Sequence, residues 1–137
     1  MHFRKDFESF VSPELTVMML RLNGFRKLTD ENGSPAGDQI LSSVGKTLTD
    51  CYVGSCAYHY SLDEFIVMGK HVPEREFADA CERSEKILGG TGIDFSAVYV
   101  YGDAKDSQDV RSMIAEAEKM LWDRRKEGEG RFRGKKF

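Results

Sequence analysis

A short apolar run near the start of the chain restricts the possible folds most strongly. Residues 15–22 are almost continuously apolar and lie between Pro13 and Gly24. A run of this length bounded by turn residues favours a strand rather than a helix, and the lack of polar alternation predicts that both faces of the strand are buried. We therefore expect residues 15–22 to form the central strand of a sheet that is covered on two sides.

The periodicity of the remaining segments predicts the elements around this strand. Apolar residues at three- to four-residue spacing indicate helices, and apolar runs or strict alternation indicate strands. With residues 15–22 as the first strand, we expect helices at 3–10, 25–31, 37–52, 73–88 and 109–125, and further strands at 56–60, 65–68, 93–101 and 131–137. The spacing places Phe77, Ala80, Cys81, Ser84 and Ile87 on the inward face of the helix at 73–88, and Met113, Ala117, Met120 and Leu121 on one face of the helix at 109–125. The order α-β-α-α-β-β-α-β-α-β predicts an α/β fold, an α+β sandwich with a central, mostly antiparallel five-stranded sheet flanked by helices.

Length, charge and cysteine content limit the classes of protein. A chain of 137 residues with 40% hydrophobic content fits a single domain spanning residues 1–137. The formal charge of −3 argues against a nucleic-acid partner, although residues 119–137 carry eight Lys/Arg against three Asp/Glu. Three cysteines without CxxC spacing, and no apolar run near ~18 residues, predict a cytoplasmic protein that does not insert in a membrane.

Two adjacent carboxylates mark the candidate site for chemistry. Asp63 and Glu64 lie in the short connection between two apolar segments that we expect to pair as a hairpin. Acidic residues at such a turn can hold a metal ion for phosphoryl transfer, so these two are the candidate catalytic residues. The alternative interpretation is that both are solvated turn residues without a ligand.

Three stretches together resemble the GGDEF domains of bacterial cyclic-di-GMP signalling. The family's Gly-Gly-Asp/Glu-Glu-Phe signature corresponds to Ser-Leu-Asp-Glu-Phe at 61–65, and its Asp-x-Asp-x-Phe-Lys block corresponds to Arg-Leu-Asn-Gly-Phe-Arg at 21–26. The family's closing helix is similar to residues 117–129. The family's usual Asp-x-Leu-Thr-Gly-Leu-x-Asn block has no counterpart, which suggests a fragment of a larger signalling protein.

The resemblance implies a palm fold similar to nucleotidyl cyclases, in which two facing domains condense two GTP into cyclic-di-GMP. It also implies metal ligands at Asp63 and at position 21, where this chain has Arg21 instead of a carboxylate. Asn23 replaces a second family Asp. Because the substitution reverses the charge of one ligand, we expect magnesium to bind poorly and Arg21 to pair with Asp63 or Glu64 instead.

Some of the family's nucleotide-binding positions carry a residue suited to that role in this chain, and others do not. The resemblance places guanine contacts at Thr29 and Asp38 and a phosphate contact at Arg125, whereas the family's next phosphate-binding Arg is Glu129 here. Asp38 could instead cap the following helix, and Arg125 could belong to a solvated helix end.

Further expectations concern the turn and the inhibitory site. Leu62, at a family glycine, is expected to cost strain or to fill ligand space. The family's inhibitory Arg-x-x-Asp site falls on residues 52–55, which lack both charges, so product binding there should be absent. We expect Trp122 to lie in the core.

The sequence therefore predicts a degenerate GGDEF domain that is catalytically impaired and serves as a regulatory or nucleotide-binding and interaction module. The alternatives are an active diguanylate cyclase with an altered metal site and a ligand-free dimerisation module. No cofactor is expected, or Mg²⁺ if the domain is active. The expected partners are a weakly bound guanine nucleotide such as GTP, other domains of a parent protein, and a second copy in a homodimer. The parent could be cytoplasmic or a membrane-attached sensor with this domain in the cytoplasm.

Overall fold

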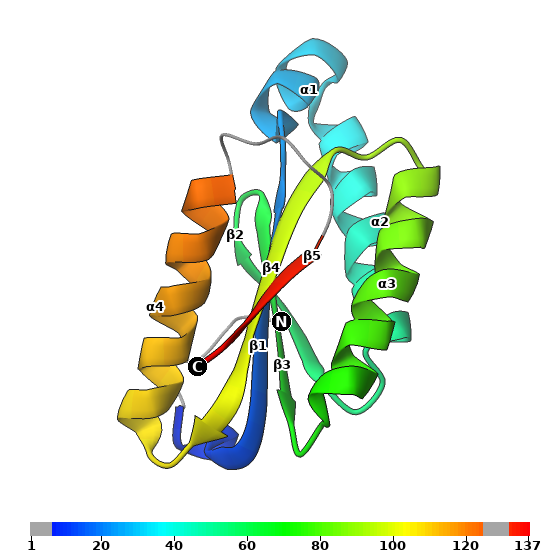
Figure 1. Ribbon diagram of the computed structural model, residues 1–137. Coiled ribbons are helices and arrows are strands. Elements are labelled where there is room, and N and C mark those ends of the chain that lie inside the picture. The colour runs from blue at the N-terminus through cyan, green and yellow to red at the C-terminus, as the bar shows by residue number, and fades with distance from the viewer. Residues whose placement is uncertain (1–6, 125–131) are drawn as a thin grey trace.

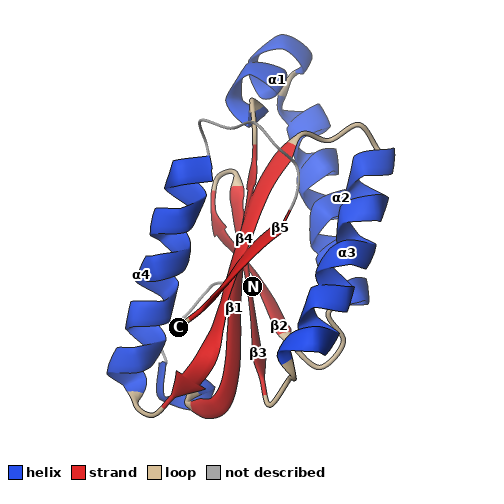
Figure 2. Ribbon diagram, in the orientation of Figure 1, coloured by secondary structure: helices blue, strands red, loops and turns tan. Residues whose placement is uncertain are grey.

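A five-stranded sheet with helices on both faces forms the molecule (Figures 1 and 2). The computed structural model describes residues 7–124 and 132–137. In chain order, the elements are η1 (Phe7–Phe10), β1 (Ser12–Leu22), α1 (Phe25–Asn32), α2 (Ser34–Cys51), β2 (Cys56–Ser61), β3 (Glu64–Lys70), α3 (Glu74–Gly90), β4 (Phe95–Ala104), α4 (Ser107–Arg124) and β5 (Phe132–Lys136). The strands are arranged β2-β3-β1-β4-β5, which confirms the predicted fold class.

Strand β1 is the centre of the sheet and is buried on both faces, as its sequence predicts. It pairs antiparallel with β3 on one side and with β4 on the other. Because side chains alternate along a strand, Met18 and Leu20 enter one core, whereas Val17 and Met19 enter the other. The apolar run at residues 15–22 therefore supplies both cores at once.

Helices α2 and α3 cover one face of the sheet, and α4 with η1 covers the other (Figure 1). Val44 of α2 and Phe77 of α3 pack in the first core. Met113 and Leu121 of α4 pack in the second, in agreement with the stripe predicted for that helix. Burial of these apolar stripes is the main stabilising contribution to the helices.

Gly24 and Gly33 lie in the two connections from β1 to α1 and from α1 to α2. Gly24 adopts the left-handed region with φ 67°, which lets the chain leave β1 and enter α1 without a loop. Gly33, with φ 86°, separates α1 from α2, and Pro35 occupies the first turn of α2. Helix α2 therefore begins at Ser34, three residues before its predicted start.

Some details differ from the sequence-based expectations. The first predicted helix is only a short 3-10 turn in the described part, Phe7–Phe10. Ile87, predicted to face the core, is 49% exposed, and its neighbour Leu88 is buried instead. The reason is that Leu88 lies four residues after Ser84 and seven after Cys81, so it shares their buried face of α3, whereas Ile87 is rotated by about 100° from it. Strand β5 joins the edge of β4 in parallel orientation.

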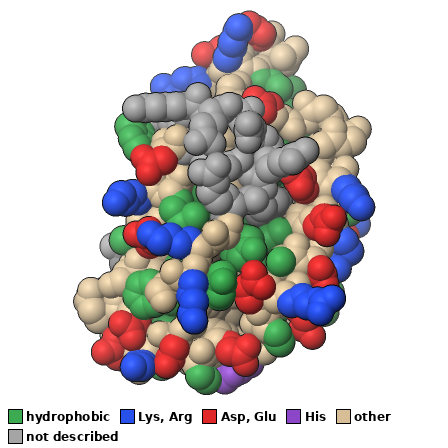
Figure 3. All heavy atoms as spheres, in the orientation of Figure 1, with side chains coloured by type: hydrophobic (Ala, Val, Ile, Leu, Met, Phe, Trp, Pro, Cys, Tyr) green, Lys and Arg blue, Asp and Glu red, His purple; other side chains and the backbone are tan. Residues whose placement is uncertain are grey.

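The surface carries mixed charge. Figure 3 shows Lys/Arg and Asp/Glu side chains interspersed on the visible face, rather than gathered by sign. None of the helices in the described ranges is both long and apolar enough to cross a bilayer.

Candidate active site around the β2–β3 turn

The register of the sheet places Arg21 directly opposite Glu64. The two residues are Cα partners at the ends of β1 and β3. Arg21 Nη2 donates a hydrogen bond of 2.8 Å to Glu64 Oε2, and the two side chains are 16% and 18% exposed. A guanidinium therefore pairs with the second acidic residue of the turn, which confirms one of the two pairings expected for Arg21.

Glu64 accepts a second hydrogen bond from within the turn. Ser61 Oγ donates to Glu64 Oε1 at 2.6 Å, so both carboxylate oxygens are engaged. Arg21 Nη1 is buried and has no hydrogen-bond partner among the described residues. The family resemblance gives Ser61 no such role, because Ser61 stands at a family glycine, although a hydroxyl three residues before a carboxylate in a tight turn is a usable signal.

Asp63 is held mainly through its backbone. The Leu22 N–H donates to the Asp63 carbonyl at 2.8 Å, which ties the turn to the end of β1. The Asp63 carboxylate makes no hydrogen bond within residues 7–124 and 132–137.

These side chains do not fit a divalent cation. A site for Mg²⁺ needs oxygen ligands that are free to coordinate, whereas Glu64 already neutralises Arg21 at 2.8 Å. In the described parts of the chain no group of three or more His, Cys, Asp or Glu side chains could hold a metal ion. The position that the family resemblance assigns to an anionic ligand therefore contains a cation engaged in an ion pair.

The turn itself is unstrained. Neither Ser61 nor Leu62 has a positive φ, since His71, with φ 56°, is the one non-glycine of the described residues that does. Leu62 is 58% exposed and points away from the protein. The expectation that Leu62 costs backbone strain is therefore wrong, because this turn does not need the left-handed backbone that a glycine provides. That its side chain fills ligand space stays a prediction.

Thr29 and Asp38 come from the adjoining helices α1 and α2. A Cβ added to Gly37 would lie 2.4 Å from Thr29 Cγ2, so Gly37 is what lets the two helices approach at this point. The Thr29 hydroxyl donates to the Arg26 carbonyl of its own helix at 2.9 Å. Asp38 is exposed and lies in the second turn of α2, so the alternative that it caps this helix is wrong.

The remaining predicted residues lie near the C-terminal end of α4. Arg125 and Glu129 fall outside the described residues. Trp122 is 56% exposed, so the expectation that it belongs to the core is wrong. It occupies the position next to Leu121 on α4, and Leu121 is the side chain that faces the sheet.

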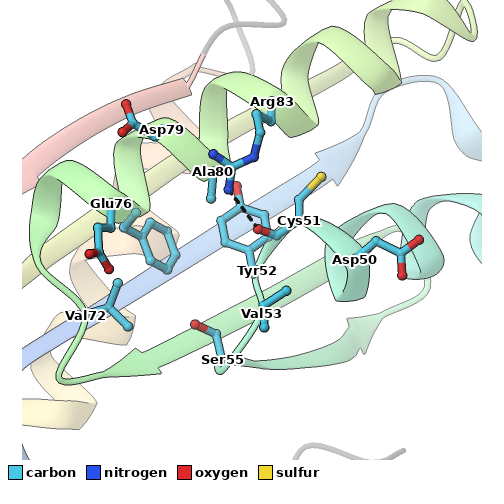
Figure 4. Close-up of a pocket in the computed structure, with 11 residues that line it drawn as sticks. Asp50, Cys51, Tyr52, Val53, Ser55, Val72, Glu76, Asp79, Ala80 and Arg83 are labelled. Carbon is cyan, nitrogen blue, oxygen red and sulfur yellow. Dashed lines mark hydrogen bonds between the residues drawn. The ribbon is translucent and has the colours of Figure 1, made fainter.

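A cavity of about 280 Å³ lies where the family resemblance places the inhibitory site (Figure 4). Tyr52 is one of the residues that line it, and the Tyr52 hydroxyl pairs with Ser84 Oγ at 3.1 Å. Burial raises the pKa of the Tyr52 phenol, so the group stays neutral. Arg83 reaches from α3 and donates to the Cys51 carbonyl at 3.4 Å, a contact across 32 residues that no local pattern could have indicated.

The charges around this cavity are mostly negative. Three carboxylates line it, from Asp50, Glu76 and Asp79, against the single guanidinium of Arg83. Such a balance disfavours a ligand with two phosphates.

Comparison with known proteins identifies the family. The family model described as "Diguanylate cyclase, GGDEF domain" matches residues 4–131. The chain belongs to the GGDEF family. It is thus a GGDEF domain of cyclic-di-GMP signalling, as its motifs predicted.

Curated relatives are longer than this GGDEF domain. It is 27% identical over 129 residues to diguanylate cyclase VdcA of Vibrio cholerae, a match covering 86% of the chain and 38% of the relative. It is 25% identical over 126 residues to diguanylate cyclase A of Treponema denticola, covering 85% and 34%. The chain therefore spans little more than a third of the length of these relatives.

Solved structures confirm the fold of the domain. The active GGEEF domain of a diguanylate cyclase from Vibrio cholerae superposes with a TM-score of 0.79 at 15% identity, covering 88% of this chain and 82% of that chain. The GGDEF domain of DgcB from Caulobacter crescentus, in complex with c-di-GMP, gives a TM-score of 0.77 at 16% identity, covering 88% and 77%. At these identities the likeness concerns the fold alone.

Proposed function

We propose that this GGDEF domain does not condense GTP and acts as a regulatory or interaction module in cyclic-di-GMP signalling. The observation that carries the proposal is the ion pair between Arg21 and Glu64. Diguanylate cyclases of the family use Mg²⁺ when active, and here a guanidinium stands at a position that the family resemblance assigns to a metal ligand.

The electrostatic cost supports this proposal. Two charges ~4 Å apart interact by roughly 4 kcal/mol at an effective dielectric of ~20, and Asp-to-Arg replacement changes the charge by two units. Glu64 offsets Arg21 but is thereby engaged itself, which leaves Asp63 as the one uncommitted carboxylate of the turn. A divalent ion would have to displace the ion pair before it could bind.

Weak binding of a guanine nucleotide remains part of the proposal. Asp38 is exposed and follows Gly37, which packs against Thr29, and an exposed carboxylate can accept two N–H bonds from a guanine edge. Thr29 has a short side chain whose hydroxyl already donates within α1, so it adds little. Arg125 is proposed as the phosphate contact by family resemblance. We expect GTP to bind weakly and without dependence on magnesium.

We also propose that the inhibitory site is not used by cyclic-di-GMP. The three carboxylates that line the cavity of Figure 4 would repel the two phosphates of that ligand. The domain would then act through contacts with other domains of a longer signalling protein or with a second copy. The relatives, which are more than twice as long as the matched region, support a multidomain parent.

The deciding experiment incubates concentrated protein with GTP and magnesium and measures cyclic-di-GMP by mass spectrometry. We expect no product over hours, and a thermal shift with GTP that is equally small with and without magnesium. Formation of product would instead establish an active cyclase with an altered ligand set, such as Asp63 and Glu64. A magnesium-dependent gain of several degrees in the melting temperature would contradict the proposed loss of the metal site.

A further inference from the structure

A second cavity, of about 430 Å³, lies beyond the end of β1, between α1, α2 and the turn from α3 to β4. Apolar side chains dominate its lining, among them Phe25 of α1, Ile40 of α2 and Ile93 of the turn. Its size falls within the range of small-molecule sites, and an apolar lining with a few polar groups is typical of them.

This cavity is separate from the predicted guanine contacts. Gln39 and Ser43 line it from α2, whereas neither Asp38 nor Thr29 does. Because successive residues of a helix are rotated by about 100°, Gln39 and Ser43 share one face of α2 and Asp38 lies on another. A ligand in this cavity would therefore leave Asp38 free.

Two polar residues of the lining, Asn23 and Asp94, offer hydrogen-bond acceptors. Asn23 Nδ2 donates to Ser96 Oγ at 3.1 Å, which leaves Asn23 Oδ1 as an acceptor. Asp94 is the one charged residue that lines the cavity within the described ranges, and its carboxylate makes no hydrogen bond there. Two acceptors, one of them negatively charged, favour a ligand that donates N–H bonds and disfavour a phosphate.

We propose that this cavity is a second ligand site, for a small flat molecule with an apolar ring, an amine or amidine group and no phosphate. The ring packs against Phe25, Ile40 and Ile93, and the cationic N–H groups face Asp94 and Asn23 Oδ1. The inference is independent of the proposed function, because it holds whether or not the domain turns over GTP.

Two backbone hydrogen bonds connect this site to the acidic turn. The Asn23 N–H donates to the Asp94 carbonyl at 2.9 Å, and the preceding Leu22 N–H donates to the Asp63 carbonyl at 2.8 Å. A ligand that fixes Asp94 and Asn23 therefore also restrains the end of β1 to which the turn is bonded. Occupancy should be detectable at Leu22 as well as in the cavity.

Benzamidine, benzamide and benzoate are suitable probes, because they share one ring and differ in charge. We expect amide proton–nitrogen NMR spectra to show saturable shifts at residues 22–28, 39–43 and 91–94 with benzamidine, weaker shifts with benzamide and none with benzoate. Equal binding of benzamidine and benzoate, or shifts confined to other surfaces, would overturn the proposal.

Two variants test the location. Ser43→Trp fills the rim from an exposed position and should abolish the saturable shifts. Asp94→Asn should weaken benzamidine about two- to fivefold, as expected for one exposed charge pair, whereas Asp103→Asn, an exposed Asp on β4, should have no effect. Unchanged benzamidine affinity in folded Ser43→Trp or in Asp94→Asn would place the binding elsewhere and contradict the assignment.

Discussion

Arg21 and Glu64 lie opposite each other on β1 and β3, and Arg21 Nη2 donates a 2.8 Å hydrogen bond to Glu64 Oε2. Both side chains are largely removed from solvent, and Arg21 Nη1 has no partner among the described residues. Each charge therefore depends on the other for compensation. This relationship connects the pairing of β1 with β3 to the proposed loss of the metal site.

Removing the carboxylate should destabilise the protein. In Glu64→Gln the Arg21 guanidinium keeps its burial but loses its counter-charge, and we expect the free energy of unfolding to fall by about 1–3 kcal/mol. Urea denaturation measures this decrease in the free energy of unfolding. The matched control is Asp50→Asn, which breaks the exposed Lys46–Asp50 pair and should cost about 0–0.5 kcal/mol. Equal losses in the two variants would mean that the Arg21–Glu64 pair contributes no more than a surface ion pair.

Restoring an anion at position 21 should restore metal binding. In Arg21→Asp combined with Glu129→Arg, Glu64 is released and joins two other carboxylates at the turn. We expect a magnesium-dependent thermal shift with GTP that the natural protein lacks. Arg75→Asp combined with Glu129→Arg, with Arg75 at an exposed position of α3, makes the same changes in charge but leaves Arg21 in place, and it should gain nothing. If the double variant also gains nothing, the correspondence of position 21 with the family's metal ligand is incorrect.

A methyl group at Gly37 should separate α1 from α2. The added Cβ would lie 2.4 Å from Thr29 Cγ2 and 3.1 Å from Phe25 Cζ, so α1 must shift. We expect Gly37→Ala to lower the free energy of unfolding by about 1–3 kcal/mol in spite of the better helix propensity of alanine. Gly45→Ala, in the same helix, meets only Phe65 at 3.7 Å and should be neutral or stabilising. A Gly37→Ala protein as stable as Gly45→Ala would show that the helices do not touch there.

Alkaline pH should weaken the fold through Cys81. Burial raises the pKa of Cys81 to about 12 from its ordinary value of 9.0. Between these values the unfolded chain has lost the thiol proton and the folded chain has kept it, so stability is complete below pH 9 and falls as the pH rises towards 12.

The Cys81→Ala variant provides the measurement. Its urea midpoint should be lower at pH 8 but should fall less between pH 9 and pH 11 than that of the natural protein, because the thiol no longer contributes. Burial also raises the pKa of Tyr99 to about 12, so part of the decline should remain. Cys56→Ala, at an exposed thiol, is the control and should keep the full decline. An unchanged decline in Cys81→Ala would exclude this thiol as its source.

Much of the fold followed from local pattern. The apolar run of β1, the alternation in β4 and the stripe of α4 predicted which faces are buried, because burial selects residues with the period of the element. Errors arose where neighbouring residues compete for the interior. Ile87 and Leu88, and likewise Leu121 and Trp122, are adjacent apolar residues, and sequence alone does not say which of the two turns inward.

The sequence by itself determined the order of the elements, the family motifs and the reversed charge at position 21. Only the tertiary structure decided that Arg21 pairs with Glu64 rather than with Asp63. It also decided that Thr29 packs against Gly37, and that Arg83 donates a hydrogen bond to the Cys51 carbonyl at the end of α2. Local patterns fix which face of a segment is buried, because each residue responds to its own neighbours. Partners that are distant along the chain depend on strand register and helix rotation, which the packing of the whole core sets.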